Sequence, residues 1–233
     1  MTYVMGDMHG EYKKYLQMLQ LIDFGDNDEL FVLGDVVDRG PEPIKLLQDM
    51  MSREKNVFPL MGNHDLMALD VLSKLMVEIT EDNYDTYLTK DIMLELDDWI
   101  YNGGDMTLTQ FRTLDKSQRQ DILDYFSEFS LCEVIDIGEK SFIMSHAGLG
   151  NFHKDKKLRA YTEEELLFGG NDPDVQYFDN PNIYLVWGHT PTRIICGEDK
   201  IYKSHNNILI DCGACFGGKL ACLCLDTMEE FYV

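Results

Sequence analysis

The chain has 233 residues, of which 45% are hydrophobic, so it can bury a sizeable core. Its formal net charge is −22, which disfavours general binding to nucleic acids or anionic membranes, because contacts with phosphate groups need lysine and arginine. No apolar run approaches the roughly 20 residues of a membrane-spanning helix, and the N-terminus lacks the basic region of a secretory signal.

Three β-like apolar segments in the first third of the chain each end in a short polar motif. The segments cover residues 2–5, 30–33 and 57–61. The motifs after them are Gly6-Asp7-Met8-His9-Gly10, Gly34-Asp35-Val36-Val37-Asp38-Arg39-Gly40 and Gly62-Asn63-His64-Asp65. Asp35 lies 28 positions after Asp7, and Asn63 lies 28 positions after Asp35. This spacing predicts a repeated β-loop-α unit, whose parallel strands deliver their loops to one edge of a sheet.

Helical patterns fill the stretches after these motifs. Tyr12, Tyr15, Leu16 and Leu19 follow an i, i+3, i+4, i+7 pattern and are expected to share one face of a helix. Pro41 and Pro43 suit the first turn of a second helix, and a third begins near residue 65. Residues 79–130 are acidic and polar, with helical periodicity at 92–96 and 122–129. We interpret residues 79–130 as a helical insertion beside the active edge of the sheet.

From residue 131 the apolar pattern becomes that of strands. Strands are expected at 131–137, 141–144, 183–187, 193–196, 201–203, 207–210, 220–225 and 231–233. A polar connection occupies 149–180, with a short helix near 163–167. Because these strands are closely spaced and separated by turns, we expect antiparallel pairing. The predicted fold class is α/β: a two-sheet β-sandwich flanked by helices, in a single domain over residues 1–233.

Six residues near the ends of these strands are candidate metal ligands. They are Asp7, His9, Asp35, Asn63, His146 and His189. Asp7 and His9 lie at i and i+2, so extended backbone directs both side chains to one side, where they can bind one cation. Asp35 can bridge two cations with its two oxygens. Asn63, His146 and His189 would complete the coordination of the second cation. Asp and Asn also suit turns and helix caps, but six such residues together favour a metal centre.

These motifs resemble those of the calcineurin-like metallophosphoesterases. More narrowly, they resemble the phosphoprotein phosphatase family, in the bacterial and phage branch that also holds the symmetric diadenosine tetraphosphatases. Ser145-His146-Ala147-Gly148 and Trp187-Gly188-His189-Thr190-Pro191 match the two later histidine motifs of that family, in order. Asn102-Gly103-Gly104 and Asp211-Cys212-Gly213-Ala214 also look familial. The resemblance spans residues 6 to about 214.

The resemblance implies a two-metal phosphoester hydrolase whose nucleophile is a hydroxide held between the two metal ions. It assigns His64 as the general acid and Asp38 as the carboxylate that orients it. Arg39 can offer a planar fork to two phosphate oxygens. The simpler alternatives are a helix cap for His64 and a surface ion pair for Arg39. Mixed nitrogen and oxygen ligands without thiolate favour manganese, with iron or zinc as alternatives.

One feature departs from the family pattern. A second arginine is expected after the Ser-His-Ala-Gly motif, but residues 167–173 contain none. Arg159, Arg193 or Asn171 are the candidates to replace it. His153 and His205 lie outside the motifs and are expected to be exposed.

The cysteines favour a reducing compartment. They are Cys132, Cys196, Cys212, Cys215, Cys222 and Cys224. Their spacing permits a zinc ribbon. However, Cys222 and Cys224 alternate with apolar residues, which indicates free cysteines buried on a strand. Without a secretory signal, we expect a cytoplasmic protein.

The sequence leaves three functions open. The first is a bacterial-type serine/threonine phosphoprotein phosphatase, and the second is a symmetric dinucleoside polyphosphate hydrolase. The third is a metal-binding relative without activity. Base-stacking aromatic residues would favour the second, and the insertion carries Tyr84, Tyr87, Trp99, Tyr101 and Phe111. We therefore expect a phosphoprotein or a dinucleoside polyphosphate as substrate, and neither nucleic acid nor membrane as partner.

Overall fold

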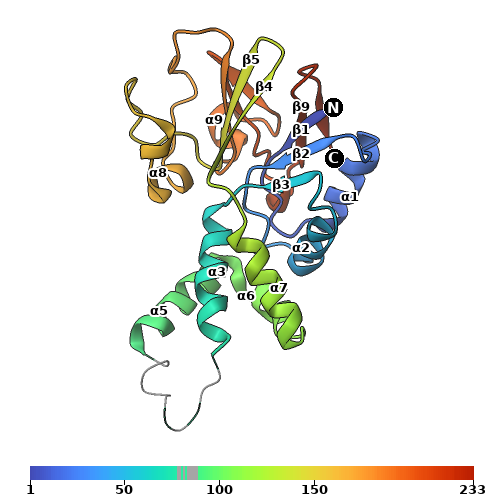
Figure 1. Ribbon diagram of the computed structural model, residues 1–233, viewed down its shortest axis with the longest axis vertical. Helices are drawn as coiled ribbons and strands as arrows, with labels where there is room; N and C mark the ends of the chain where they lie inside the picture. The colour runs from blue at the N-terminus through green and yellow to red at the C-terminus, as the bar shows by residue number, and fades with distance from the viewer. Residues whose placement is uncertain (78–79, 81, 83–88) are drawn as a thin grey trace.

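The computed structural model describes residues 1–77, 80, 82 and 89–233. In this part of the chain, two five-stranded sheets pack face to face, with helices outside them (Figure 1). The two-sheet α/β prediction is confirmed. Within the same residues, no helix combines the length and apolarity that crossing a bilayer requires.

The first sheet has the strand order β10-β9-β1-β2-β3. Its strands are β1 (Thr2–Met5), β2 (Glu29–Val32), β3 (Val57–Pro59), β9 (Ala221–Cys224) and β10 (Glu230–Tyr232). β1, β2 and β3 run parallel, as the repeated spacing predicted, and β9 pairs antiparallel with both β1 and β10. The carboxyl ends of the three parallel strands therefore meet at one edge.

The second sheet has the strand order β4-β5-β6-β8-β7. Its strands are β4 (Cys132–Ile137), β5 (Lys140–Ser145), β6 (Ile183–Trp187), β7 (Tyr202–Ser204) and β8 (Asn207–Leu209). The expected antiparallel pairing holds for β4–β5 and β7–β8 but is wrong for β5, β6 and β8, which run parallel. The long connections before β6 and β8 leave enough chain for the crossovers that parallel strands need.

The strand expected at 193–196 is also wrong, because these residues form the short helix α9 (Thr192–Cys196). Pro191 precedes the first helical residue, and its carbonyl oxygen accepts from the backbone N–H of Ile194 at 2.9 Å. Gly197, with φ 78°, ends the helix in the left-handed conformation typical of a C-terminal glycine. Capping residues therefore outweigh the β-branched Ile194 and Ile195.

The helices lie outside the two sheets. They are α1 (Tyr12–Leu21), α2 (Pro43–Ser52), α3 (Asn63–Leu75), α5 (Lys90–Trp99), the π-helix η1 (Ile100–Gly104), α6 (Asp105–Phe111), α7 (Lys116–Ser127), the 3-10 helix η2 (Leu158–Ala160), α8 (Glu163–Leu167) and the 3-10 helix η3 (Ala214–Phe216). The elements α5, η1, α6 and α7 lie within residues 79–130, and α5 and α7 pack on α3 below the sheets (Figure 1). Tyr84 and Tyr87 lie outside the described residues.

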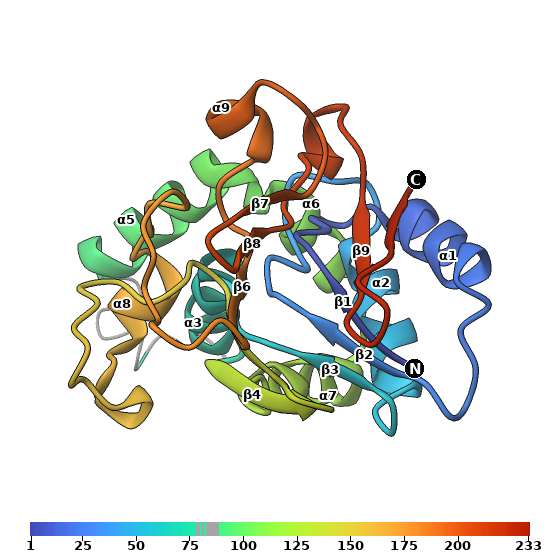
Figure 2. The same cartoon turned by 90° about the horizontal axis from the view of Figure 1, so that it is seen from above.

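The core between the sheets positions the functional loops. Val4 and Leu33 from the first sheet pack with Phe142 and Val186 from the second, and all four are fully buried. Seen from above, α8 and its connection lie beyond the second sheet, and α1 lies at the opposite side of the molecule (Figure 2). The rigid core fixes the carboxyl ends of β1, β2, β3, β5, β6 and β8, from which the polar loops extend.

Candidate metal centre

The six candidate ligands follow the ends of five strands and converge between the two sheets. Asp7 follows β1, Asp35 follows β2, Asn63 follows β3, His146 follows β5 and His189 follows β6. Five of the six are buried and His189 is half-buried. Because the strands before these loops run parallel within each sheet, their carboxyl ends bring together residues far apart in the sequence.

Asp35 lies between two groups of side chains that could hold a metal ion, although His64 in the first group is the candidate acid and not one of the six candidate ligands. One group is His9, Asp35 and His64, and the other is Asp35, His146 and His189. Within each group the ligand atoms lie within 4.8 Å of one another. His9 Nε2 is 3.3 Å from Asp35 Oδ2, and His146 Nε2 is 3.5 Å from Asp35 Oδ1. One carboxylate therefore faces both groups with different oxygens.

Backbone carbonyls set the tautomers of two of these histidines. His9 Nδ1 donates to the carbonyl oxygen of Val37 at 2.9 Å, and His146 Nδ1 donates to that of Leu33 at 2.7 Å. A carbonyl oxygen can only accept, so both imidazoles turn the Nε2 lone pair toward Asp35. Burial also lowers the pKa of His146 and lowers the pKa of His189 to about 4. Neutral imidazoles are the form that binds a metal.

Hydrogen-bond acceptors face one another around Asn63. Its Oδ1 lies 2.9 Å from His146 Nε2 and 3.0 Å from His189 Nδ1. The Asn63 oxygen and the His146 lone pair cannot donate to each other, and a cation satisfies both. The oxygen and nitrogen ligands thus fit divalent metal ions such as manganese, iron or zinc.

Buried carboxylates also favour cations here. Asp7, Asp35 and Asp211 are all buried. Burial, reinforced by the neighbouring Asp211 and Asp35, raises the pKa of Asp7 well above its ordinary value. Burial likewise raises the pKa of Asp211 to about 6. Asp7 lies beside the two groups, and both of its oxygens accept from the backbone N–H of His189, at 3.1 and 3.0 Å.

His64 and Asp38 form a hydrogen-bonded pair beside this centre. His64 Nδ1 lies 2.9 Å from Asp38 Oδ2. Its other ring nitrogen, Nε2, accepts from Arg39 Nη2 at 2.7 Å, while Arg39 Nη1 donates to His9 Nε2 at 2.7 Å. The guanidinium fork therefore spans the candidate acid and a candidate metal ligand.

The loops that carry these residues adopt unusual backbone conformations. Five site residues have positive φ angles: His9, Asp35, Asp38, Arg39 and His189. Such conformations cost about 1–3 kcal/mol each for residues other than glycine. Asp65 supports the central loop by accepting from the backbone N–H of Val36 at 2.9 Å and that of Gly62 at 3.0 Å. Burial raises the pKa of Asp65 to about 7.

Sequence reasoning missed three residues at the centre. Asp211 follows β8, and it lies at the centre because β8 runs parallel to β6. An apolar run precedes Asp211, as similar runs precede Asp7 and Asp35. This pattern was the signal from which the sequence could have identified Asp211. Trp99 and Thr107 from the insertion donate hydrogen bonds to Asp38. The sequence drew attention to that segment through the Asn102-Gly103-Gly104 motif and through Trp99 as an aromatic residue that could stack on a base, but Trp99 is buried and contacts Asp38 instead.

The candidates to replace the second arginine have different surroundings. Arg193 is paired with Asp199 through Nε at 2.6 Å and Nη2 at 2.7 Å. Arg159 is exposed. Asn171 lies against the His146 loop, where its Oδ1 accepts from the backbone N–H of Leu149. Of the three, only Asn171 contacts the loop of a candidate ligand.

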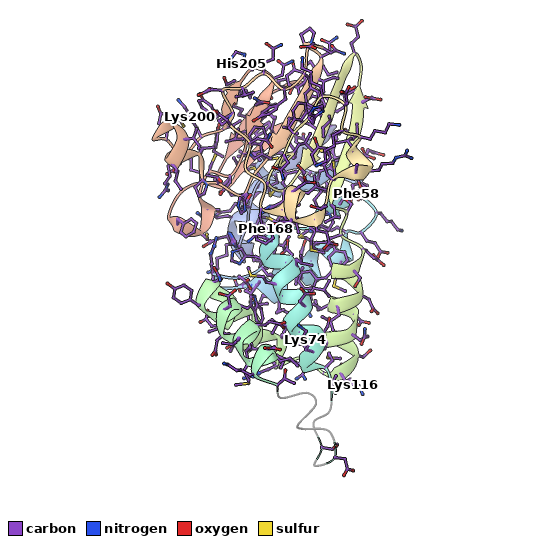
Figure 3. The ribbon with its side chains drawn as sticks, turned by 90° about the vertical axis from the view of Figure 1, so that its left-hand side faces the viewer. Phe58, Lys74, Lys116, Phe168, Lys200 and His205 are labelled. Carbon is purple, nitrogen blue, oxygen red and sulfur yellow. The ribbon has the colours of Figure 1, made fainter. Side chains whose placement is uncertain are left out.

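The remaining histidines and cysteines lie as expected. His153 and His205 are exposed, and Figure 3 shows His205 at the upper end of the molecule, far above Phe168 in that view. The six cysteines are free thiols, with Cys222 and Cys224 buried on β9. Burial raises the pKa of Cys212 and of Cys215 to about 12.

The family model of calcineurin-like phosphoesterases matches residues 2–193. A symmetrical bis(5'-nucleosyl)-tetraphosphatase of Wigglesworthia glossinidia brevipalpis is 32% identical over 99 residues, covering 42% of this chain and 36% of the relative. The match thus spans about a third of the length of that curated relative, 36%.

Two further proteins are similar over nearly the whole chain. An asymmetrical bis(5'-nucleosyl)-tetraphosphatase of Bacillus cereus is 24% identical over 97% of this chain and 91% of its own length. A solved structure described as a candidate diadenosine tetraphosphatase has a TM-score of 0.67 and 17% identity, covering 100% of this chain and 92% of its own. At that identity, the second likeness shows a shared fold alone.

Proposed function

Because the chain belongs to the calcineurin-like phosphoesterase family, we propose that its metal centre hydrolyses phosphoric esters of alcohols. The proposed substrate is a phosphomonoester such as phosphoserine or phosphothreonine in a protein. The residue roles below are part of this proposal.

Two divalent cations would bind at the converging ligands, and we favour manganese as the metal. Asp7, His9 and Asp35 would hold one ion, and Asp35 would share in holding the other. The ligands of the second ion would be completed by Asn63, His146 and His189. When bound, such ions supply a nucleophile derived from water at neutral pH and neutralise charge on the phosphoryl group.

The protein side chains would orient the phosphoryl group and protonate the leaving group. The planar fork of Arg39 is suited to two phosphoryl oxygens, which would replace its contacts with His9 and His64. His64 would donate a proton to the departing alkoxide through Nε2, since Nδ1 is engaged by Asp38. Asp38 would hold the imidazole in that orientation.

The single observation that carries the choice of substrate is the hydrogen-bonded pair of His64 and Asp38. An alkoxide leaving group is strongly basic, so its departure needs a proton donor. A nucleotide leaving group is a phosphate, whose second pKa lies near 6, so it departs more easily unprotonated. A buried, oriented imidazole that can donate a proton therefore contributes most to the hydrolysis of esters of alcohols.

A second candidate function is the hydrolysis of dinucleoside polyphosphates. The names of the relatives from Wigglesworthia and Bacillus favour it. So does Phe216, whose ring lies 5.1 Å from Arg39 Cζ and is 52% exposed. An exposed aromatic ring beside a phosphate-binding arginine is suited to stacking on a base.

One assay panel tests both candidates. The protein, purified and loaded with manganese, is given a phosphoserine peptide, diadenosine tetraphosphate and an aryl phosphate. The proposed function predicts the highest kcat/KM for the peptide. A preference for diadenosine tetraphosphate would support the second candidate instead, and absence of turnover on all three would favour a metal-binding relative without activity. Stripping the metal with a chelator is the control.

We also propose that residues 1–233 form one domain and that the protein works in the cytoplasm. The free state of its six cysteines agrees with a reducing compartment.

A further inference from the structure

We infer that Trp99 and Thr107 are positioning residues that hold Asp38 and thereby set the orientation of the acid His64. Both come from the helical insertion, Trp99 at the end of α5 and Thr107 on α6. The inference rests on the proposed function of His64. It gives the insertion a role in the reaction beyond covering the sheets.

The Asp38 carboxylate has donors on both oxygens. Trp99 Nε1 donates to Asp38 Oδ2 at 2.8 Å, and the same oxygen receives His64 Nδ1 at 2.9 Å. Thr107 Oγ1 donates to the other oxygen, Oδ1, at 2.7 Å. Asp38, Trp99 and Thr107 are at most 1% exposed. Because a buried carboxylate needs such donors, the insertion determines where this one points.

The insertion also holds the backbone that carries Asp38 and Arg39. The backbone N–H of Asp38 donates to Thr107 Oγ1 at 3.0 Å, and that of Arg39 donates to the Gly103 carbonyl oxygen at 2.8 Å. Asp38 and Arg39 have φ angles of 69° and 63°, so their conformation needs support from its surroundings.

Two glycines allow this close approach. Gly103 has φ 105°, and a Cβ there would lie 2.7 Å from Arg39 Cγ. A Cβ on Gly104 would overlap the indole ring of Trp99. Both glycines lie in η1, where the non-helical backbone of Gly103 places a kink between α5 and α6. The Asn102-Gly103-Gly104 motif thus serves the contact between the insertion and the Asp38 loop.

The arrangement links two neighbouring parts of the site. His64 lies in the first turn of α3, and α5 packs against α3 (Figure 1). A shift of α5 would move the Trp99 indole and remove one of the two contacts of Asp38 Oδ2, leaving that oxygen to His64 alone. The alignment of the acid therefore depends on the packing of the insertion.

Enzyme kinetics test the inference through the leaving group. Trp99→Phe removes the N–H and retains an aromatic ring, and Thr107→Val removes the hydroxyl. Each should lower kcat/KM about 10- to 100-fold for an alkyl phosphate, as loss of a partner that orients a working histidine does. The loss should be smaller for an aryl phosphate, and metal content should be unchanged. Leu108→Ala, on α6 beside Thr107, is the control for general loosening and should affect both substrates equally.

Combined variants and a measurement independent of activity complete the test. In a His64→Asn background, Trp99→Phe should have little further effect, because both changes remove the same function. The chain has two tryptophans, so its indole N–H spectrum by NMR has two signals, and Trp99→Phe identifies one. In metal-free protein, Asp38→Ala should shift that signal and speed its exchange with solvent.

The outcomes separate this inference from the proposed function. Equal losses for both substrates, additive effects in the His64→Asn background, or an indole signal unaffected by Asp38→Ala would overturn it. If the wild-type protein hydrolyses none of the phosphate substrates, the proposed function fails, whatever the NMR result for Trp99 and Asp38.

Discussion

Asp35 accepts a hydrogen bond from the backbone N–H of His64, with its Oδ1 3.0 Å from the nitrogen. The same carboxylate faces His9 with one oxygen and His146 with the other. The residue proposed to share both metal ions therefore also holds the first turn of α3, which carries the proposed acid. In the proposed mechanism, metal binding and proton transfer are therefore linked through the Asp35 side chain.

We predict two metal ions per chain, and loss of both when Asp35 is changed. Elemental analysis of protein loaded with manganese should give a ratio near two for the wild type. Asp35→Asn should lower this ratio well below one, because it removes the only candidate ligand common to both groups. Asp136→Asn, on the exposed face of β4, removes one negative charge away from the centre and is the control. A wild-type ratio near zero under saturating metal would contradict the metal centre.

His64→Asn should separate metal binding from catalysis. It removes the proposed proton donor and leaves every proposed metal ligand in place, so metal content should be unchanged. Turnover of an alkyl phosphate should fall roughly 10²–10⁴-fold, the usual contribution of a general acid. For an aryl phosphate the fall should be smaller, because that leaving group needs less protonation. Equal losses on both substrates, or loss of metal, would show that His64 is not the acid.

Arg39→Ala should lower kcat/KM by more than about tenfold, which corresponds to about 1.4 kcal/mol. A charge-assisted hydrogen bond contributes about 1.5–3 kcal/mol, and the fork can make two. Arg39→Lys should recover only part of the activity, since an ammonium group cannot reproduce the fork. The matched control is Arg193→Ala, which removes an arginine paired with Asp199. If that variant loses more activity than Arg39→Ala, the phosphate is held from the other side.

Glu165 should make the wild-type protein more stable at neutral pH than at low pH. Its pKa is lowered from 4.5 to about 2, chiefly by the hydrogen bond from Lys156 and then by that from the backbone N–H of Thr162. A carboxyl group with a depressed folded-state pKa stabilises the fold above its unfolded pKa, and the effect is lost as pH falls through the folded pKa. The stabilisation should therefore be complete at pH 7 and disappear between about pH 4.5 and 2.

Glu165→Gln tests this by thermal unfolding across pH. The variant should have a lower Tm than the wild type at pH 7, and the two values should converge toward pH 2. Glu163→Gln, in the same first turn of α8, makes the same change of charge and is the control. If both variants show the same dependence on pH, helix charge and not the Lys156 contact is responsible.

Local sequence patterns were sufficient to predict much of this protein. The apolar runs before Asp7, Asp35 and Asn63 predicted the parallel strands β1, β2 and β3, because the side-chain period of a strand and its polar ending are properties of consecutive residues. The same motifs identified the residues that converge between the sheets. The two-sheet fold followed from the change to strand patterns after residue 131.

Pairing between distant segments could not be obtained in this way. The parallel alignment of β5, β6 and β8, which brings Asp211 to the centre, depends on which strands become neighbours. The capping of α9 at Pro191 and Gly197 likewise outweighed a β-like composition.

The contacts around Asp38 depend most on the tertiary structure. Trp99 and Thr107 lie 61 and 69 positions from Asp38 along the chain. Nothing in the local pattern of either residue indicates its partner, since an indole or a hydroxyl in a helix is equally compatible with a core or a surface position. The sequence by itself therefore determined which residues are the candidates for binding metal and phosphate. The packing of α5 and α6 against the Asp38 loop decided how they are oriented, because hydrogen bonds to a buried carboxylate form only where the fold brings the donors to it.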